Sequence, residues 1–386
     1  MEKVYNSRLY VLLTVGMVSA LGPFVTDFYL PSLPALTGYF AASAPLVQLS
    51  LTFSMVGLAT GQLVIGPLSD RYGRKRPLVW SMVVFCLSTV GCLFSPDIYA
   101  FLFFRSLQGL AGAGGVVISK SIASDLYEEQ ELTRFFSMLS AVQGLAPICA
   151  PVLGGILLEY TDWRGIFIVL SGVGVLLTLV LLRFRESLSS SARLQGGIGT
   201  AFRNYLSILH DRPFLGYVLV QAFAMGVMFA YISASPFIFQ RHFGLSPLAY
   251  SLCFGINALA IMAGSLAVTR FRSARRALRI GVRGFFAAGG LVAAALVWGS
   301  VWTVEAALLA LLLFLGLILP SSTTLALELE RRNSGNASAA LGFLMFLVGG
   351  VLSPLTGLGD MFSPTAVIVV LCSMAAWSVE RRLGQE

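Results

Sequence analysis

Long apolar stretches follow one another along the whole chain of 386 residues, and they constrain its fold more than any other feature. Each is long enough to cross about 30 Å of hydrocarbon, which takes roughly 20 residues of α-helix. The twelve stretches lie at about 9–31, 46–68, 77–95, 98–123, 134–158, 164–183, 213–239, 247–269, 279–299, 302–327, 336–359 and 364–380. The sequence therefore predicts an all-α membrane protein with twelve transmembrane helices.

The scarcity of charge agrees with lipid as the solvent. Only 11% of the residues are charged and 57% are apolar, whereas an average soluble protein carries about 25% charged residues. This balance excludes a soluble enzyme, a nucleic-acid-binding domain and a disordered chain. The net charge of +8 indicates no nucleic-acid partner, because the basic residues lie in short clusters between apolar stretches. Five cysteines in apolar stretches and two histidines show no ligand spacing, so we expect no metal site and no cofactor.

The distribution of Lys and Arg predicts the orientation in the membrane. If the N-terminus is cytoplasmic, 22 of the 26 basic residues fall on the cytoplasmic side, and only Arg164 and Arg241 fall outside. The other two, Arg105 and Lys120, lie within the fourth stretch. Cytoplasmic loops are enriched in Lys and Arg. We therefore expect both termini in the cytoplasm, which requires an even number of spans.

The longest connection between apolar stretches is polar and covers residues 184–212. It separates a predicted N-terminal six-helix bundle at 1–183 from a C-terminal six-helix bundle at 213–386, with a cytoplasmic linker between them. The pattern Ala150-Pro151-x-x-Gly154 recurs as Ser353-Pro354-x-x-Gly357, 203 residues later. Two repeated halves of six helices are the architecture of one large class of secondary transporters.

An ordered string, GPLSDRYGRKR, follows the second stretch at positions 66–76. A basic cytoplasmic loop would explain its charges but not their order. Gly66 permits close helix packing, and Gly73 permits a tight turn without a Cβ penalty. Asp70 is an acid at a helix end that could lie against the positive N-terminus of another helix. The run of good N-cap residues at 333–336 offers such a helix start.

Two charged residues inside apolar stretches are candidates for function. Asp27 is read as the one acid well inside such a stretch, where a carboxylate costs roughly 2.5–3.5 kcal/mol and therefore pairs or serves function. Arg105 heads a helical stripe of small and polar residues that includes Gln108. Asp27 and Arg105 lie in the outer half of the bilayer and could meet. The pair is then either a proton-exchanging acid beside a base or a static salt bridge, and Arg105 could instead snorkel to the interface.

Small residues recur on the fifth stretch at the spacing of a close helix contact. They are Ala146, Ala150 and Gly154, with Pro151 and Gly155 beside them. The eighth stretch offers a partner face formed by Ile256, Ala260 and Gly264.

These strings together resemble a known family. The string at 66–76 is similar to the signature between helices 2 and 3 of the major facilitator superfamily, and RSLQG at 105–109 resembles its R-x-x-Q-G motif. APICAPVLGG at 146–155 resembles the GP-x-x-GG antiporter motif of drug exporters, with Ala150 where the family commonly has glycine. TDFYLPSLP at 26–34 and SPF at 235–237 resemble the bicyclomycin-resistance (Bcr/CflA) branch of drug:proton antiporters.

The resemblance implies the major facilitator fold, alternating access and a place in the bacterial inner membrane. It suggests proton coupling at Asp27 and Arg105, and packing at the antiporter motif. It implies a conformational latch formed by Gly66, Asp70, Arg71, Gly73 and Arg74. Candidate substrate contacts in the central cavity are Asp27, Ser54, Gln108, Gln143, Phe229, Tyr231 and Asn257.

The leading hypothesis is proton-coupled efflux of small, mainly apolar drugs, such as chloramphenicol- or bicyclomycin-like compounds, by a monomer embedded in membrane lipid. The alternative is a dedicated exporter of an endogenous metabolite such as a sugar, an amino acid or a siderophore. A channel should show rings of charge, which are missing, and the antiporter-like fifth stretch argues against an importer. No Ser/His/Asp, HExxH or paired-acid pattern appears, so we expect no enzyme.

Overall fold

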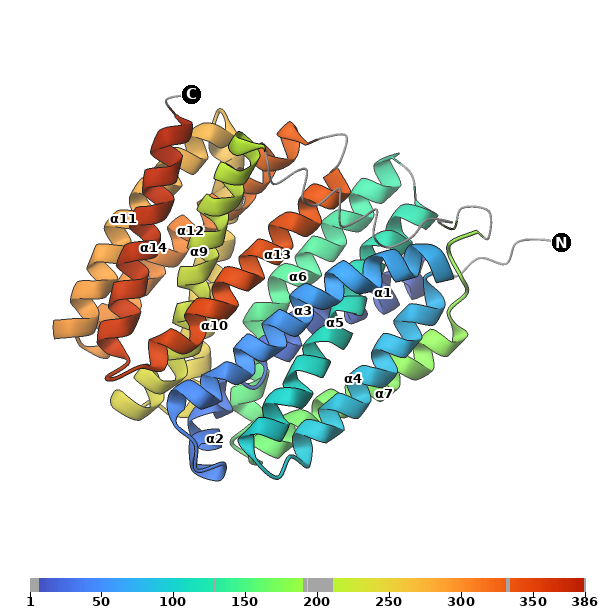
Figure 1. Cartoon of the computed structure of the whole chain (residues 1–386), viewed down its shortest axis with the longest axis horizontal. Helices are drawn as coiled ribbons and strands as arrows, with labels where there is room; N and C mark the ends of the chain where they lie inside the picture. Colours follow the sequence, from blue (N-terminus) through green and yellow to red (C-terminus); the bar gives the residue numbers. More distant parts are fainter. Residues whose placement is uncertain (1–6, 128, 190–192, 194–210, 331–333, 385–386) are drawn as a thin grey trace.

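The computed structural model describes residues 7–127, 129–189, 193, 211–330 and 334–384, without the side chains at 129–130, 132–134, 136–138, 140–144, 334–336 and 338–339. Within these ranges the regular structure is helical throughout, and twelve long helices run through the molecule (Figure 1). They are α1 (Arg8–Asp27), α3 (Ala44–Tyr72), α4 (Lys75–Leu93), α5 (Ile98–Leu126), α6 (Glu129–Leu157), α7 (Trp163–Arg183), α9 (Arg212–Pro236), α10 (Pro247–Ala267), α11 (Ala274–Trp298), α12 (Val301–Leu329), α13 (Ser334–Leu352) and α14 (Phe362–Leu383).

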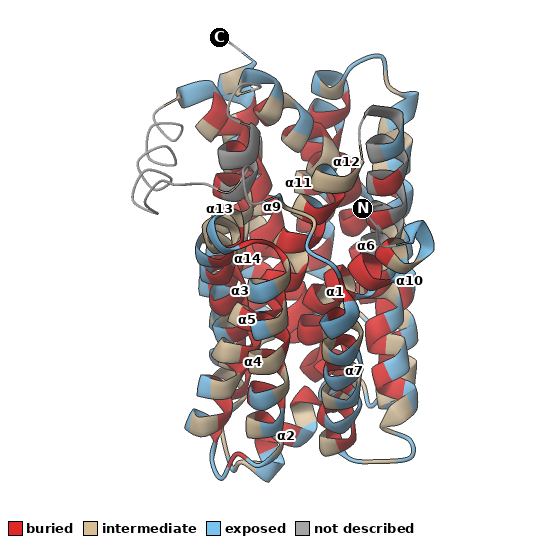
Figure 2. Ribbon diagram, turned by 90° about the vertical axis from the view of Figure 1, so that its right-hand side faces the viewer, coloured by how far each residue is buried: buried red, intermediate tan, exposed pale blue. Residues whose placement is uncertain are grey.

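The long helices are suited to a bilayer. Eleven segments of the described chain are long and apolar enough to cross a membrane. Helix α6 has 29 residues, and its apolar segment Leu145–Leu157 is shorter than these eleven. Buried positions line the inner faces of the helices, while exposed positions recur along their outward faces (Figure 2). Large apolar side chains such as Trp80, Leu176 and Leu291 lie on those outward faces, where lipid would cover them. The predicted all-α membrane protein is confirmed.

Short polar side chains begin several helices. Asp97 accepts a hydrogen bond of 2.8 Å from the backbone N–H three residues later, and Asp211 does the same at 3.2 Å. Ser246 and Ser273 cap α10 and α11 in this way. Such caps satisfy N–H groups that the first turn leaves free. They therefore mark where each apolar stretch begins as a helix.

Prolines interrupt three of the predicted stretches. Helix α1 ends at Asp27, and the chain continues as a 3₁₀ turn, η1 (Leu30–Ser32), and a short helix, α2 (Leu33–Tyr39). Helix α9 passes at Pro236 into a π-helical turn, η3 (Phe237–His242), and α13 passes into a 3₁₀ turn, η6 (Ser353–Gly357). Because proline lacks an N–H and crowds the preceding turn, these spans are broken near one end rather than continuous.

Two pairs of helices cross at glycines. On α5, a Cβ at Gly109 would collide with the Ser54 carbonyl of α3. On α12, a Cβ at Gly316 would collide with the Ile261 carbonyl of α10, and Gly264 of α10 lies against α12 in return. Without side chains at these points the backbones can approach closely. The same packing device thus recurs in the first and second parts of the chain.

The small-residue face of α6 packs on α1 rather than on the predicted face of α10. Gly154 lies against the carbonyl at the end of α1, and the neighbouring Gly155 lies against Ser251 of α10. Of the predicted partner face, Ile256 is 51% exposed and Gly264 contacts α12. That part of the prediction is wrong, because consecutive residues point about 100° apart on a helix, so the two glycines face different neighbours. The remaining predicted packing residues are buried: Ala146, Ala150 and Pro151.

The two ends of the helices differ in charge. Because the twelve helices alternate in direction, α1 begins and α14 ends at the same end of the molecule. This end carries arginines at the helix termini and is called the basic end; they include Arg8, Arg71, Arg183, Arg270 and Arg382. Its location in the cytoplasm stays a prediction. So does the division at 184–212, because most of that segment lies outside the described residues.

Candidate functional site

A cavity of about 1110 Å³ lies among helices from both parts of the chain. It is lined by α1, α3, α5 and α6 on one side and by α9, α10, α12 and α13 on the other. Most of the lining side chains are apolar, and within that lining Asp27 is the acid and Lys120 the base. The uncharged polar lining residues are Ser19, Thr26, Gln62, Gln221, Tyr231, Ser265 and Thr323.

Hydrogen bonds close the molecule at the end opposite the basic end. Gln48 Nε2 of α3 donates to the Ser233 carbonyl at 3.0 Å and to Thr356 Oγ1 at 3.3 Å. Thr52 Oγ1 donates to the Gly350 carbonyl at 2.8 Å. Each of these bonds joins a residue of the first part of the chain to one of the second part. We call this region the sealed end.

A second, outer set of contacts extends the sealed end. Gln240 Nε2 donates to the Pro31 carbonyl at 3.0 Å, and Arg241 Nη2 donates to Thr37 Oγ1 at 2.8 Å. These bonds join η3, which follows α9, to η1 and α2, which follow α1. The broken helix ends therefore supply part of the closure.

Asp27 is the last residue of α1 and lines the cavity. The residue is 6% exposed. No described basic side chain forms an ion pair with it. A carboxyl group in such a place changes its interactions with the surroundings strongly when it gains or loses a proton. Asp27 therefore has the placement that proton exchange requires.

Arg105 is fully buried, and its contacts leave Asp27 aside. Its guanidinium donates to the Val25 carbonyl at 2.9 Å and to Gln108 Oε1, and it lies 4.1 Å from the centre of the Tyr29 ring. The predicted meeting of Asp27 and Arg105 as a salt bridge is not found in this structure, and neither is snorkelling to the interface. The Val25 carbonyl, Gln108 and the Tyr29 ring thus surround the guanidinium. Through its hydrogen bond to the Val25 carbonyl, Arg105 holds the backbone at the end of α1.

The predicted substrate contacts divide into two groups. Phe229 and Tyr231 line the cavity with Asp27. The other described ones are buried behind the lining: Ser54, Gln108 and Asn257. Gln108 Nε2 donates to Thr89 Oγ1 at 2.8 Å, and Gln108 Oε1 accepts from Arg105. The amide therefore binds Thr89 and Arg105 rather than the cavity. Gln143 belongs to α6, but its side chain lies outside the described residues.

A second buried acid was not predicted from the sequence. Glu305 of α12 is 7% exposed, and Asn257 Nδ2 donates to its Oε2 at 3.1 Å. The same Nδ2 donates to the Tyr231 hydroxyl at 3.1 Å. The signal was present, because an acid lies inside the stretch at 302–327, but its place near the start of that stretch resembled an interfacial residue. Sequence reasoning also missed seven polar lining residues: Ser19, Thr26, Gln62, Lys120, Gln221, Ser265 and Thr323.

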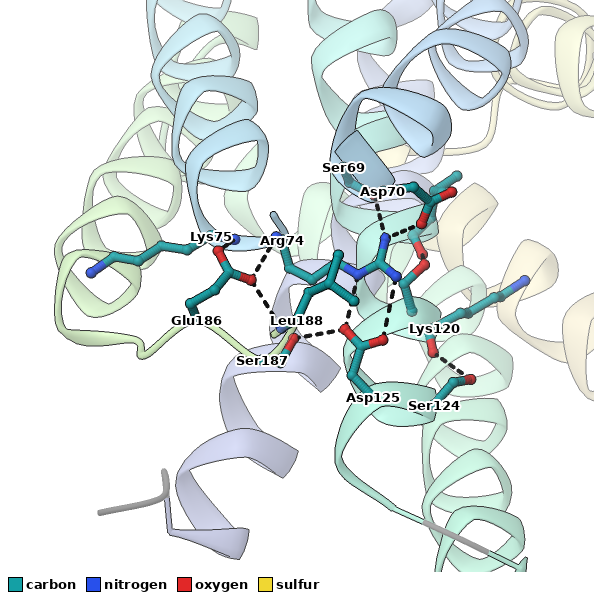
Figure 3. Close-up of polar contacts among 12 residues, drawn as sticks. Ser69, Asp70, Arg74, Lys75, Lys120, Ser124, Asp125, Glu186, Ser187 and Leu188 are labelled. Atoms are coloured by element: carbon teal, nitrogen blue, oxygen red, sulfur yellow. Dashed lines mark hydrogen bonds and ion pairs between the residues drawn. The ribbon is translucent and has the colours of Figure 1, made fainter. Parts of the chain in front are cut away.

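The predicted latch contains a charge cluster at the basic end (Figure 3). Arg74 contacts Asp70, donates to Ser69 Oγ at 2.9 Å, and forms an ion pair with Asp125 of α5 at 2.9 Å. Burial lowers the pKa of the Arg74 guanidinium, but the hydrogen bonds and charges of Asp125 and Asp70 outweigh it and raise its pKa above the usual value. The cluster therefore stays charged at Arg74 and ties α3 and α4 to α5.

The turn before α4 is held from the segment that follows α7. Glu186 accepts hydrogen bonds from the backbone N–H groups of Arg74 at 2.7 Å and Lys75 at 3.2 Å (Figure 3). Gly73 has a φ of 90°, which favours glycine, and a Cβ there would strike Glu186. A carboxylate at a helix N-terminus is favourable. The turn thus needs both the glycine and the acid.

The remaining latch residues have simpler surroundings. Gly66 lies near the Val117 side chain, and Arg71 stacks over the Tyr72 ring at 5.4 Å. Asp70 pairs with Arg74 in this structure. Its predicted contact with the start of the eleventh span stays a prediction, because residues 331–333 and the side chains that follow them lie outside the description.

Comparison with known proteins decides the family. The sequence model of the Major Facilitator Superfamily matches residues 13–354. The chain belongs to the Major Facilitator Superfamily. Among relatives, an uncharacterized MFS-type transporter, YdgK of Bacillus subtilis, is 39% identical over 98% of each chain. The bicyclomycin resistance protein homolog of Haemophilus influenzae is 29% identical over 97% of this chain and 95% of its own.

Other relatives and solved structures agree. A chloramphenicol resistance protein of Pseudomonas aeruginosa is 26% identical, covering 98% of this chain and 89% of its own. The crystal structure of a D-xylose-proton symporter superposes with a TM-score of 0.75 at 16% identity, over 96% of this chain and 97% of that one. A bacterial homolog of the human lysosomal transporter Spinster gives a TM-score of 0.75 at 17% identity, over 98% and 99%. These structures show the fold.

Membership of the Major Facilitator Superfamily has direct consequences. The protein is a multi-pass membrane transporter of small molecules, not an enzyme, and its bacterial relatives place it in the inner membrane. The resemblance to the bicyclomycin- and chloramphenicol-resistance branch is confirmed.

Proposed function

We propose that the protein exports small, mainly apolar compounds in exchange for protons, with Asp27 as the coupling carboxyl group. The observation that carries the proposal is Asp27 itself, a buried acid on the wall of a largely apolar cavity that forms no ion pair with a described residue. Relatives named for bicyclomycin and chloramphenicol resistance support drug-like cargo. An apolar wall also favours cargo that loses little hydration on entry.

Coupling follows from competition at the cavity wall. An ionised Asp27 is costly to bury, and either a proton or a cargo molecule with a polar group relieves that cost. The carboxyl group therefore releases cargo when it takes up a proton. Arg105 acts on this exchange indirectly, because its hydrogen bond to the Val25 carbonyl holds the end of α1 in place.

Transport also requires two states of the molecule. In this proposal the basic end faces the cytoplasm, where positive charge is favoured, and the parts at 1–183 and 213–386 rock against each other within a monomer. The sealed end opens in the alternate state. The charge cluster around Arg74 then contributes to closing the basic end.

The test is transport by purified protein in proteoliposomes, with chloramphenicol as the probe. Asp27→Asn should lose accumulation driven by a pH gradient and keep exchange of labelled for unlabelled chloramphenicol. Glu159→Gln, which changes an exposed acid, serves as the matched control and should behave as wild type. If Asp27→Asn still accumulates chloramphenicol against its gradient, Asp27 is not the coupling group.

Export of an endogenous metabolite is the second candidate. It is favoured by the amine of Lys120 and the amides of Gln62 and Gln221 in the lining, which suit polar or anionic cargo. A drug-susceptibility panel in a pump-deficient host, with and without an uncoupler, separates the two. Protection against at least one apolar drug supports drug efflux, whereas protection against none supports the metabolite exporter.

A further inference from the structure

We propose that Glu305 binds a second proton and that Asn257 and Tyr231 transmit its protonation to the cavity. The inference rests on the proposed proton-coupled export and adds a site to it. It places one carboxyl group in each part of the chain, Asp27 on α1 and Glu305 on α12. Asp27 meets cargo directly, whereas Glu305 acts through its two neighbours.

Three helices bring this group together inside the protein. Glu305 comes from α12, Asn257 from α10 and Tyr231 from α9, and all three side chains are buried. Tyr231 also lines the cavity, where its ring stacks on Phe254 with 5.5 Å between ring centres. Asn257 therefore stands between a buried acid and the hydroxyl group of a residue that lines the cavity.

Few groups stabilise a negative charge at Glu305. Its Oε1 and the Asn257 Oδ1 have no hydrogen-bond partner among the described residues. The titratable neighbours from α9 and α10 are Tyr231, Tyr250 and Cys253, none of them basic. Helix α11 carries its ionisable residues at 275–283, the far end from Glu305, and described α13 carries none. A buried carboxylate with one hydrogen bond is costly, and a proton removes that cost.

The amide of Asn257 can serve both protonation states. When Glu305 is ionised, the amide nitrogen donates to the carboxylate and to the Tyr231 oxygen, as the structure shows. The Tyr231 O–H then remains able to donate into the cavity. When Glu305 is protonated, its O–H needs an acceptor, and a half-turn of the amide presents Oδ1 instead. The Tyr231 O–H must then also donate to Oδ1.

This reversal links the proton to cargo. In the ionised state Tyr231 can donate a hydrogen bond to a carbonyl, nitro or other acceptor on the cargo. In the protonated state that donor is occupied by Asn257. Cargo with a hydrogen-bond acceptor and a proton on Glu305 therefore exclude each other, which is the requirement for exchange in opposite directions. The class of cargo is narrowed to apolar molecules that carry an acceptor.

The first experiment detects the proton without any cargo. Infrared difference spectra of the purified full-length protein, recorded between mildly alkaline and mildly acidic pH, should contain a carboxylic acid C=O band that Glu305→Gln abolishes. Asp27→Asn should leave this band in place, and Glu159→Gln should leave the whole spectrum unchanged. A Glu305→Gln spectrum identical to wild type would overturn the proposal.

A second variant keeps Glu305 and covers the case in which Glu305→Gln does not fold. Asn257→Leu should shift the C=O band to the higher frequency of an acid without a hydrogen-bond partner, while an unshifted band would contradict the role of Asn257. For the link to cargo, the wild type should bind chloramphenicol at least severalfold more weakly at acidic pH. The Asp27→Asn variant should keep a weaker binding of chloramphenicol at acidic pH. The double variant Asp27→Asn, Tyr231→Phe should lose this pH dependence.

Proton flux in proteoliposomes separates this inference from the proposed function. If the Glu305 band is present but chloramphenicol moves no protons, the proposed export mechanism fails and the proton site stands. If chloramphenicol-driven proton flux is normal and the band is absent, the proposed function stands and the second site falls.

Discussion

The Gln48→Leu substitution should open the sealed end. Leucine is similar in size but donates no hydrogen bond, so the variant loses the bonds to Ser233 and Thr356. A hydrogen bond contributes about 0.5–1.5 kcal/mol net, so the two contribute about 1–3 kcal/mol, which corresponds to about 5- to 150-fold in an equilibrium. Gln48 Oε1 is buried and has no hydrogen-bond partner among the described residues, and leucine removes that unfavourable group as well. We therefore expect a shift of about tenfold, toward the lower part of this range.

Spin labels can measure this shift. Tyr160 and Ser300 are exposed residues in loops at the sealed end, one from each part of the chain, and can be changed to cysteine after the five native cysteines are replaced. Pulsed electron–electron distance measurements should show a larger population of long distances in Gln48→Leu than in its parent. Thr60→Val is the matched control on α3, because the hydrogen bonds of the Thr60 hydroxyl to described residues all lie within its own helix.

Two results would refute the reasoning. Unchanged distances in Gln48→Leu, with the protein folded, would mean that these hydrogen bonds do not hold the closed state. An equal shift in Thr60→Val would mean that the distances report a weakened α3 rather than the loss of contacts across the sealed end.

Three further predictions follow from the packing and the charge cluster. Gly109→Ala should lower the stability of the protein by about 3 kcal/mol, because the new Cβ would strike α3. Gly112→Ala should be neutral or stabilising, since its Cβ would meet only ordinary contact distances. Thermal unfolding in detergent compares the two variants, and equal melting temperatures would contradict the described packing of α5 on α3. Arg74→Gln should lower stability by about 2–3 kcal/mol by leaving Asp125, whose side chain is 11% exposed, without its ion pair, while exposed Arg71→Gln should change it little in the same assay. Asp70→Asn should slow chloramphenicol transport while leaving its equilibrium binding intact, and a normal initial rate would exclude Asp70 from the latch.

The spans were predictable because the bilayer imposes a length and a composition on every helix. The predicted stretch at 46–68 and helix α3 overlap throughout, and the same holds for 98–123 and α5. What the pattern could not predict was where helices break near prolines, as after Asp27. A hydropathy pattern records apolar length and not the hydrogen-bonding pattern of the backbone.

The candidate site was only partly accessible to sequence reasoning. The structure places three of the predicted residues in the cavity lining: Asp27, Phe229 and Tyr231. The number of the helix in the chain was enough to predict that an acid or aromatic residue on it lies near the cavity. The partners of Arg105 could not be predicted, since its guanidinium binds a backbone carbonyl that any residue would supply. Glu305 was missed because depth in the bilayer depends on how α12 is placed against α9 and α10.

The end of α1 at Asp27 has a consequence for how the protein enters the membrane. Helix α1 contains 20 residues, about 30 Å of helix, which already equals the hydrocarbon thickness. A nascent first segment can thus be inserted with its carboxylate in the hydrated headgroup region, where charge is cheap. Asp27 becomes enclosed later, when α6, α9 and α10 are synthesised and fold around it. While α1 alone spans the bilayer, the residue that the finished transporter buries therefore lies outside its oily centre.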